Sequence, residues 1–197
     1  MHASNPFATR FTRPGAIGYL FPEGQSGEGL VEKLRASDWW GEIIGPHGTG
    51  KSTLLASLVP VLEAAERSIV RITLSEGERQ LPLANAEASG WNSSTQVIID
   101  GYEQLSWWSR WRIKSRCRKR GAGLLVTAHQ PMSLPPLVTM QPSVELTRQV
   151  VAQLLAGDTT LSDEDVATAF AQQQGNVRET LFALYDLYHA RRGVCQP

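Results

Sequence analysis

The stretch Gly45-Pro46-His47-Gly48-Thr49-Gly50-Lys51-Ser52 decides the fold of this 197-residue chain. It follows a short apolar run, Trp39 to Ile44, and leads into Lys51 to Glu66, where leucines recur at helical spacing. A loop of this composition between a strand and a helix points backbone N–H groups inward, and the positive end of the helix dipole faces the bound anion. The sequence therefore predicts a phosphate-binding loop.

The residue types in this loop suit a nucleoside triphosphate. Glycine lets the backbone approach the phosphate oxygens where a side chain would collide. Lys51 is expected to contact the β- and γ-phosphates, and Ser52 to place its hydroxyl on Mg²⁺. We expect ATP and Mg²⁺ as ligands. The predicted nucleotide-binding residues are Gly45, Pro46, His47, Gly48, Thr49, Gly50, Lys51, Ser52 and Thr53.

Further apolar runs have the composition of strands that are buried on both faces of a parallel sheet. The predicted strands are 39–44, 69–74, 96–99, 124–128 and, as the weakest, 144–147. The connection from Asp100 to Gly123 has to cross over between parallel strands, which favours a helix over Tyr102 to Lys119. The fold class predicted is a three-layer α/β sandwich with a five-stranded, mainly parallel sheet.

The sequence becomes helical throughout after Thr147. Ser162 and Asn176 are suitable caps for two further helices, with acids in the first turn of one and Glu179 reaching back in the other. This pattern of helices predicts a small C-terminal lid. We expect a nucleotide-binding domain over 1–147 with an N-terminal extension over 1–37, a helical lid over 148–192, and a tail over 193–197.

A carboxylate follows the apolar run Val97–Ile99, at the end of a strand where a parallel sheet places its ligands. This residue, Asp100, is predicted to hold Mg²⁺ together with Ser52. The next acid is Glu103, which for catalysis has to orient or deprotonate the attacking water. The alternative is that Glu103 is only an acid at the start of a helix, where it interacts favourably with the helix dipole.

Two stretches resemble the NACHT and related signal-transduction NTPases, which are P-loop NTPases akin to the AAA+ ATPases. Asp100-Gly101-Tyr102-Glu103-Gln104-Leu105 looks like their Asp-Gly-x-acid-x-Leu strand, and Leu124 to Pro131 is similar to the strand that follows it. The resemblance implies that Thr127 is the polar sensor of the γ-phosphate. His129 stands where those proteins usually have an arginine. A purely structural strand threonine is the alternative for Thr127.

Two other stretches resemble AAA+ proteins. Gly175-Asn176-Val177-Arg178-Glu179 is similar to the segment that opens their lid helix, which implies that Arg178 reaches the nucleotide. The alternative is a surface arginine, although a cation in the first helical turn is unfavourable to the dipole. Asn5-Pro6-Phe7 resembles the opening of several bacterial members, where this stretch lies near the adenine.

The resemblance implies a Mg²⁺-dependent ATPase or an ATP-driven switch of the AAA+ or NACHT-like type. A non-hydrolysing nucleotide-dependent scaffold is the main alternative, because Gly101 occupies the position where related ATPases commonly carry a catalytic glutamate. A small-molecule kinase is a further alternative, since such enzymes share the phosphate loop. Leu74 to Gln80 resembles the ABC ATPase signature, but the single helix and strand between Ser52 and Ser75 leave no room for the subdomain that those enzymes insert.

The segment Trp107 to Arg120 combines three tryptophans with seven basic residues and no acid. One interpretation is a docking surface for nucleic-acid phosphates or an acidic protein, with tryptophan as an anchor. The other is a crossover helix whose tryptophans pack on the sheet while the charges are solvated. We favour the second, because a crossover helix has to bury one face.

The overall composition favours no particular macromolecular partner, since the formal net charge is zero and the pI about 6.9. No signal peptide or membrane-length apolar run is present in the sequence, so we expect a cytoplasmic protein without membrane insertion. The AAA+ resemblance suggests a homo-oligomer. Cys117 and Cys195 are far apart and in no metal-ligand spacing, so we expect both to be reduced.

Overall fold

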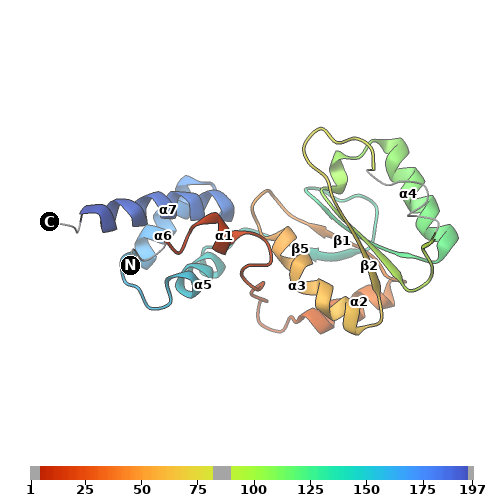
Figure 1. Cartoon of the computed structure of the whole chain (residues 1–197), viewed down its shortest axis with the longest axis horizontal. Helices are drawn as coiled ribbons and strands as arrows, with labels where there is room; N and C mark the ends of the chain where they lie inside the picture. The colour runs from red at the N-terminus through yellow and green to blue at the C-terminus, as the bar shows by residue number, and fades with distance from the viewer. Residues whose placement is uncertain (1–4, 82–89, 195–197) are drawn as a thin grey trace. The chain divides into compact units, whose positions relative to one another are not determined.

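The computed structural model describes residues 5–81 and 90–194. The chain divides into two compact units (Figure 1). The helical unit comprises Met1–Leu20, Pro46–Leu54 and Gln141–Pro197, and the sheet unit comprises Phe21–Gly45 and Leu55–Met140. Cys195 lies outside the described residues.

Five parallel strands form the centre of the sheet unit. They are β1 (Trp40–Ile44), β2 (Ser68–Thr73), β3 (Thr95–Asp100), β4 (Gly123–Ala128) and β5 (Pro136–Thr139), in the order β2-β3-β4-β1-β5. Every residue of β3 and β4 is buried, as expected for central strands that are covered on both faces. In this order β4 lies between β1 and β3. Because all strand pairs are parallel, the carboxyl end of β4 lies at the same edge of the sheet as theirs.

Four of the predicted strands are confirmed, each within one residue at both ends. The prediction for 144–147 is wrong, because these residues form the first turn of helix α5 (Val144–Leu155). Ser143 caps this helix by accepting a hydrogen bond from the N–H of Leu146 at 3.2 Å. The fifth strand is β5, a four-residue strand that begins with a proline and, among the described strands, pairs with β1 alone.

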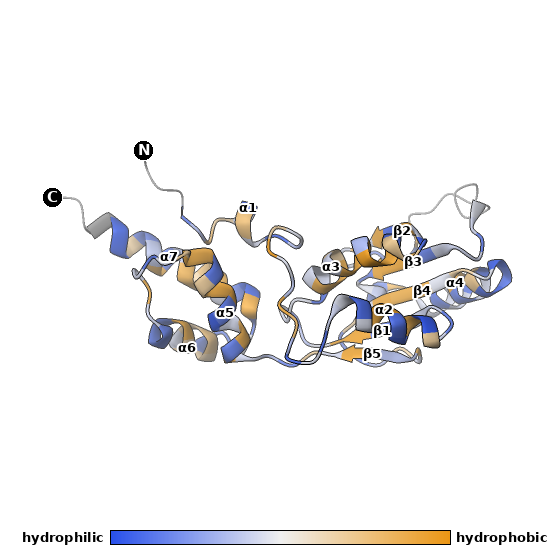
Figure 2. Ribbon diagram, turned by 90° about the horizontal axis from the view of Figure 1, so that it is seen from below, coloured by the Kyte–Doolittle hydropathy of each residue, from blue (hydrophilic) through white to orange (hydrophobic). Residues whose placement is uncertain are grey.

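The helices of the sheet unit bury one face each. In α2 (Gly27–Ala36), capped by Ser26, the buried apolar residues are Leu30, Val31 and Leu34. The helix α3 (Lys51–Ala64) follows the phosphate loop and buries the four leucines at 54, 55, 58 and 62, which confirms the predicted periodicity. A short 3₁₀ helix, η2 (Tyr102–Gln104), precedes α4 (Trp107–Arg120). Figure 2 shows the contrast between the apolar strands and the largely hydrophilic α4.

The crossover helix α4 packs on the sheet through Ile113 and Cys117, which are 1% and 0% exposed. The prediction that the tryptophans pack there is wrong: Trp107, Trp108 and Trp111 are 67%, 63% and 56% exposed. Residues four apart share one face of a helix, so Ile113 and Cys117 together form the face that packs on the sheet. The three indoles therefore point to solvent. Burial raises the pKa of the Cys117 thiol to about 12, which keeps it protonated and unreactive at neutral pH.

Helices α1 (Thr9–Thr12), α5, α6 (Asp163–Gln172) and α7 (Val177–Val194) belong to the helical unit. Its core joins Phe7, at 1% exposure, to residues of the three longer helices such as Val151, Val166 and Leu184. The predicted caps are confirmed: Ser162 forms a capping box with Asp165, and the N–H of Glu179 donates to Oδ1 of Asn176 at 3.2 Å. Among the described residues, no helix has the length and hydropathy of a membrane span.

The orientation of α4 predicts a clear difference between two single substitutions. Ile113→Ala should lower the free energy of unfolding by about 2–5 kcal/mol, because it removes buried methyl groups and leaves a cavity. Trp111→Ala, on an exposed part of the same helix, should change this free energy by less than about 0.5 kcal/mol. Urea unfolding followed by circular dichroism measures both, and equal losses would contradict the observed orientation of α4.

Candidate functional site

The phosphate loop has the backbone conformation that its glycines predict. Gly48 and Gly50 have φ angles of +73° and +90°, in the left-handed region that residues with a Cβ rarely adopt. The carbonyl of Pro46 accepts hydrogen bonds from Oγ1 of Thr49 at 3.0 Å and from Nζ of Lys51 at 2.7 Å. The loop therefore closes on itself and holds the Lys51 ammonium beside it.

Helix α3 begins at Lys51, directly at the end of the loop. The first N–H groups of any α-helix have no carbonyl partner within the helix, and they carry the positive end of its dipole. Ser52 and Thr53 lie in this first turn and are half-buried. The end of the loop thus presents backbone donors, an ammonium group and two hydroxyls, a combination that suits phosphate oxygens.

The start of α7 lies against the phosphate loop within the helical unit. A Cβ placed on Gly48 would meet Oδ1 of Asn176 at 1.8 Å, so the side chain of Asn176 touches the loop at this glycine. The same oxygen caps α7 through the N–H of Glu179. Arg178 lies in the first turn of this helix, two residues after Asn176.

A mainly apolar pocket continues from the loop in the helical unit. It is lined by Gly50 and Thr53 of the loop and first turn, by Ile17 and Tyr19 of the N-terminal segment, and by Val150 and Leu181 of α5 and α7. Burial raises the pKa of Tyr19, so its phenol is neutral at physiological pH. An apolar pocket that shares residues with a phosphate loop has the character of a nucleoside site.

In the sheet unit, Asp100 and Thr127 form a buried hydrogen-bonded pair at the carboxyl ends of β3 and β4. Oγ1 of Thr127 donates to Oδ1 of Asp100 at 2.6 Å and accepts from the N–H of Gly101 at 2.9 Å. The two residues are 9% and 1% exposed. Thr127 therefore fixes the orientation of the carboxylate that the sequence assigns to Mg²⁺.

Gly101 is required by the backbone at the end of β3. Its φ angle is +84°, and a Cβ at this position would lie 2.9 Å from the carbonyl oxygen of Leu74. A glutamate directly after Asp100 would meet both obstacles. The turn leads into η2, which carries the next acid, Glu103.

Glu103 is held close to His129. Its Oε1 lies 3.2 Å from Nδ1 of His129, and its backbone carbonyl accepts a hydrogen bond from Nη2 of Arg110 at 2.6 Å. Its second oxygen, Oε2, is buried without a hydrogen-bond partner among the described residues. A buried carboxylate oxygen without a partner is costly, so a water molecule or a ligand hydrogen would be bound there favourably.

The residues predicted from the sequence thus fall into two groups. The helical unit holds the loop from Pro46 to Thr53 together with Arg178, and the sheet unit holds Gly45, Asp100, Glu103 and Thr127. Two contacts in these groups were not predicted: that of Asn176 with the loop and the pairing of His129 with Glu103. The Asn176-Val177-Arg178 segment and the position of His129 after β4 marked these places without giving their contacts.

Several solved structures have a similar fold. A variant of the RuvB protein of Thermotoga maritima has a TM-score of 0.58 and 12% identity, covering 88% of this chain and 69% of its own. A DNA replication initiation factor has a TM-score of 0.57 and 14% identity, with 84% and 61% covered. The AMPPCP-bound DnaA of Aquifex aeolicus has a TM-score of 0.55 and 14% identity, with 84% and 62% covered.

These neighbours are AAA+ ATPases, and at such low identity the likeness establishes the fold alone. The chain has the α/β fold of a P-loop NTPase, as its loop predicts. It spans 61% to 69% of the length of these proteins. The sequence matches no protein-family model and no curated protein.

The contact between Asn176 and the loop predicts a penalty specific to Gly48. Gly48→Ala and Gly24→Ala both place a Cβ on a left-handed residue, which costs about 1–2 kcal/mol, but a Cβ at Gly24 meets nothing within 4 Å. Gly48→Ala should lower the free energy of unfolding by about 1–3 kcal/mol more than Gly24→Ala, because Asn176 has to move and weaken its cap. Chemical denaturation measures both variants, and equal losses would exclude the Asn176 contact.

Proposed function

We propose that this chain binds ATP with Mg²⁺ and hydrolyses it, as an ATPase of the AAA+ type. The observation that carries the proposal is the pocket of the helical unit, which shares Gly50 and Thr53 with the phosphate loop. A phosphate site beside an apolar pocket suits a nucleoside triphosphate better than free phosphate. The Asp-Gly-x-acid sequence at Asp100 favours the NACHT-like branch and, with it, an ATP-driven switch.

In this proposal Lys51 and the N–H groups at the start of α3 bind the phosphates. Ser52 and Asp100 hold Mg²⁺, and their hydroxyl and carboxylate oxygens are the hard donors that this ion prefers. The hydrogen bond from Thr127 to Oδ1 supports this assignment, because it orients the carboxylate and leaves it further acceptor capacity. Bound Mg²⁺ would neutralise charge on the phosphates.

The chemical step we propose is attack of a water oxygen on the γ-phosphorus. The new P–O bond forms as the bond to the bridging oxygen breaks, the electron pair leaves with ADP, and a water proton passes to Glu103. The partnerless Oε2 of Glu103 supports this role, and His129 serves as a positioning residue through Oε1. Arg178 couples the nucleotide to closure of the predicted lid over 148–192, and self-association belongs to the same proposal.

A non-hydrolysing switch is the second candidate. Gly101 favours it, because the backbone excludes a glutamate directly after Asp100. The two candidates share the nucleotide site and differ only in the part played by Glu103.

Hydrolysis of Mg²⁺-ATP by the purified chain tests the proposal, with nucleotide binding followed in the same samples. Lys51→Ala should lose tight binding and turnover together. Glu103→Gln should keep binding and lose turnover by about 10²–10⁴-fold, the usual size of a general-base contribution. Glu32→Gln is the matched control, because Glu32 is 65% exposed on α2 and should leave both properties unchanged.

Two outcomes are decisive against parts of this account. Wild-type protein that binds ATP without turnover would favour the non-hydrolysing switch. Lys51→Ala with wild-type affinity would remove the phosphate loop from the nucleotide site altogether.

A further inference from the structure

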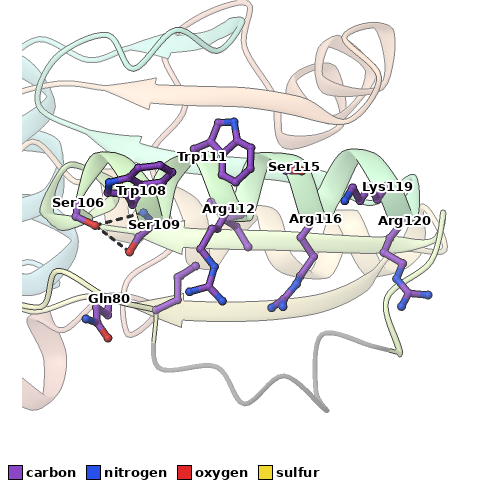
Figure 3. A pocket seen from close by; sticks show the side chains of 12 residues that line it. Gln80, Ser106, Trp108, Ser109, Trp111, Arg112, Ser115, Arg116, Lys119 and Arg120 are labelled. Atoms are coloured by element: carbon purple, nitrogen blue, oxygen red, sulfur yellow. Dashed lines mark hydrogen bonds between the residues drawn. The ribbon is translucent and has the colours of Figure 1, made fainter.

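A hollow of about 760 Å³ lies along α4 in the sheet unit, and its lining contains none of the residues assigned to ATP. One side is the segment with Gln80 and Leu81, and the other is α4 itself. Figure 3 shows that Arg112, Arg116 and Arg120 project to the same side of the helix. These residues are four apart, so their side chains repeat about every 6 Å along the helix axis.

The basic residues of α4 divide into two sets. Arg110 and Lys114 donate to the backbone carbonyls of Glu103 and Met132, and Arg118 stacks on the ring of Trp40. These three cations fasten the helix to the body of the sheet unit. The other four cations, Arg112, Arg116, Lys119 and Arg120, line the hollow, and the described residues of its lining include no acid.

The indoles of α4 form a continuous exposed aromatic cluster. The ring centroids of Trp107 and Trp108 are 4.5 Å apart, and those of Trp108 and Trp111 are 6.1 Å apart, both edge to face. Trp108 and Trp111 also line the hollow. A contiguous cluster of exposed large apolar side chains is a common mark of an interaction surface.

We propose that this hollow binds single-stranded nucleic acid, DNA or RNA, with the phosphates along the arginine row and bases stacked on Trp108 and Trp111. Four cations in a chain of zero net charge select a polyanion. Exposed indoles select a polyanion with flat aromatic groups. A duplex hides the faces of its bases, a lipid surface does not fill a hollow, and an acidic peptide supplies no regular series of rings.

The test is binding of a fluorescein-labelled 12-nucleotide oligodeoxythymidine and an oligouridine of equal length to the wild-type chain, by anisotropy and by quenching of tryptophan fluorescence. Saturable binding of either oligonucleotide with quenching of tryptophan fluorescence is expected. The oligonucleotide that binds more tightly shows whether the natural ligand is DNA or RNA. Lys51→Ala should bind equally well, since Lys51 is not among the residues that line the hollow.

Two kinds of variant separate stacking from charge. Trp111→Ala should raise the Kd by about 5- to 150-fold, with less quenching and an unchanged salt dependence. Arg112→Gln should reduce the slope of log K against log salt by about 0.7, the value for one lost phosphate contact on a single strand. Phe182→Ala and Arg35→Gln are matched controls for an exposed aromatic and an exposed cation, and should bind like wild type.

Competition experiments give the results that would overturn the proposal. Inorganic polyphosphate, polyglutamate or anionic phosphatidylglycerol vesicles that compete as well as the oligonucleotide, at equal charge, would exclude base stacking. Unaltered affinity in Trp111→Ala would exclude it as well, and failure of both oligonucleotides to bind would exclude the surface itself. Circular dichroism of each variant confirms that a loss of binding is not a loss of folding.

Discussion

The parallel pairing of β4 with both β1 and β3 is the constraint on which the sheet unit depends. It brings the carboxyl ends of three strands to one edge, where β1 leads into the phosphate loop and β3 ends at Asp100. It also places Thr127 within hydrogen-bond distance of that carboxylate. A polar residue at this point of β4 is thus explained by the strand order, since the oriented carboxylate needs a donor beside it.

The fold was predictable because its signals are local and strong. The loop from Gly45 to Ser52 and the largely apolar, fully buried strands β3 and β4 mark a parallel sheet by composition alone. The edge strand β5 was missed because four residues that begin with proline carry almost no periodic signal, whereas Val144–Thr147 has β-branched residues in what is a helix start. There the cap at Ser143 prevails over intrinsic strand preference.

The contacts of the candidate site were less predictable than its residues. The sequence marks Glu103 and His129 as unusual, but their 3.2 Å approach depends on the left-handed turn at Gly101. The Leu74 carbonyl, distant in sequence, lies 2.9 Å from where a Cβ at position 101 would be and so favours glycine in this turn. The same holds for α4, where only the three-dimensional packing of Ile113 and Cys117 decides that the tryptophans face outward. The helix consequently provides the core with two side chains and exposes its three tryptophans.

The central claim is that the phosphate loop and the adjoining apolar pocket together bind one nucleoside triphosphate. Calorimetric titration of the wild-type chain with Mg²⁺-ATP, inorganic triphosphate and adenosine tests it most directly. We predict one ATP per chain, with triphosphate and adenosine each binding far more weakly, because each contacts only one of the two parts. Triphosphate that binds as tightly as ATP, or the absence of saturable ATP binding, would contradict the account.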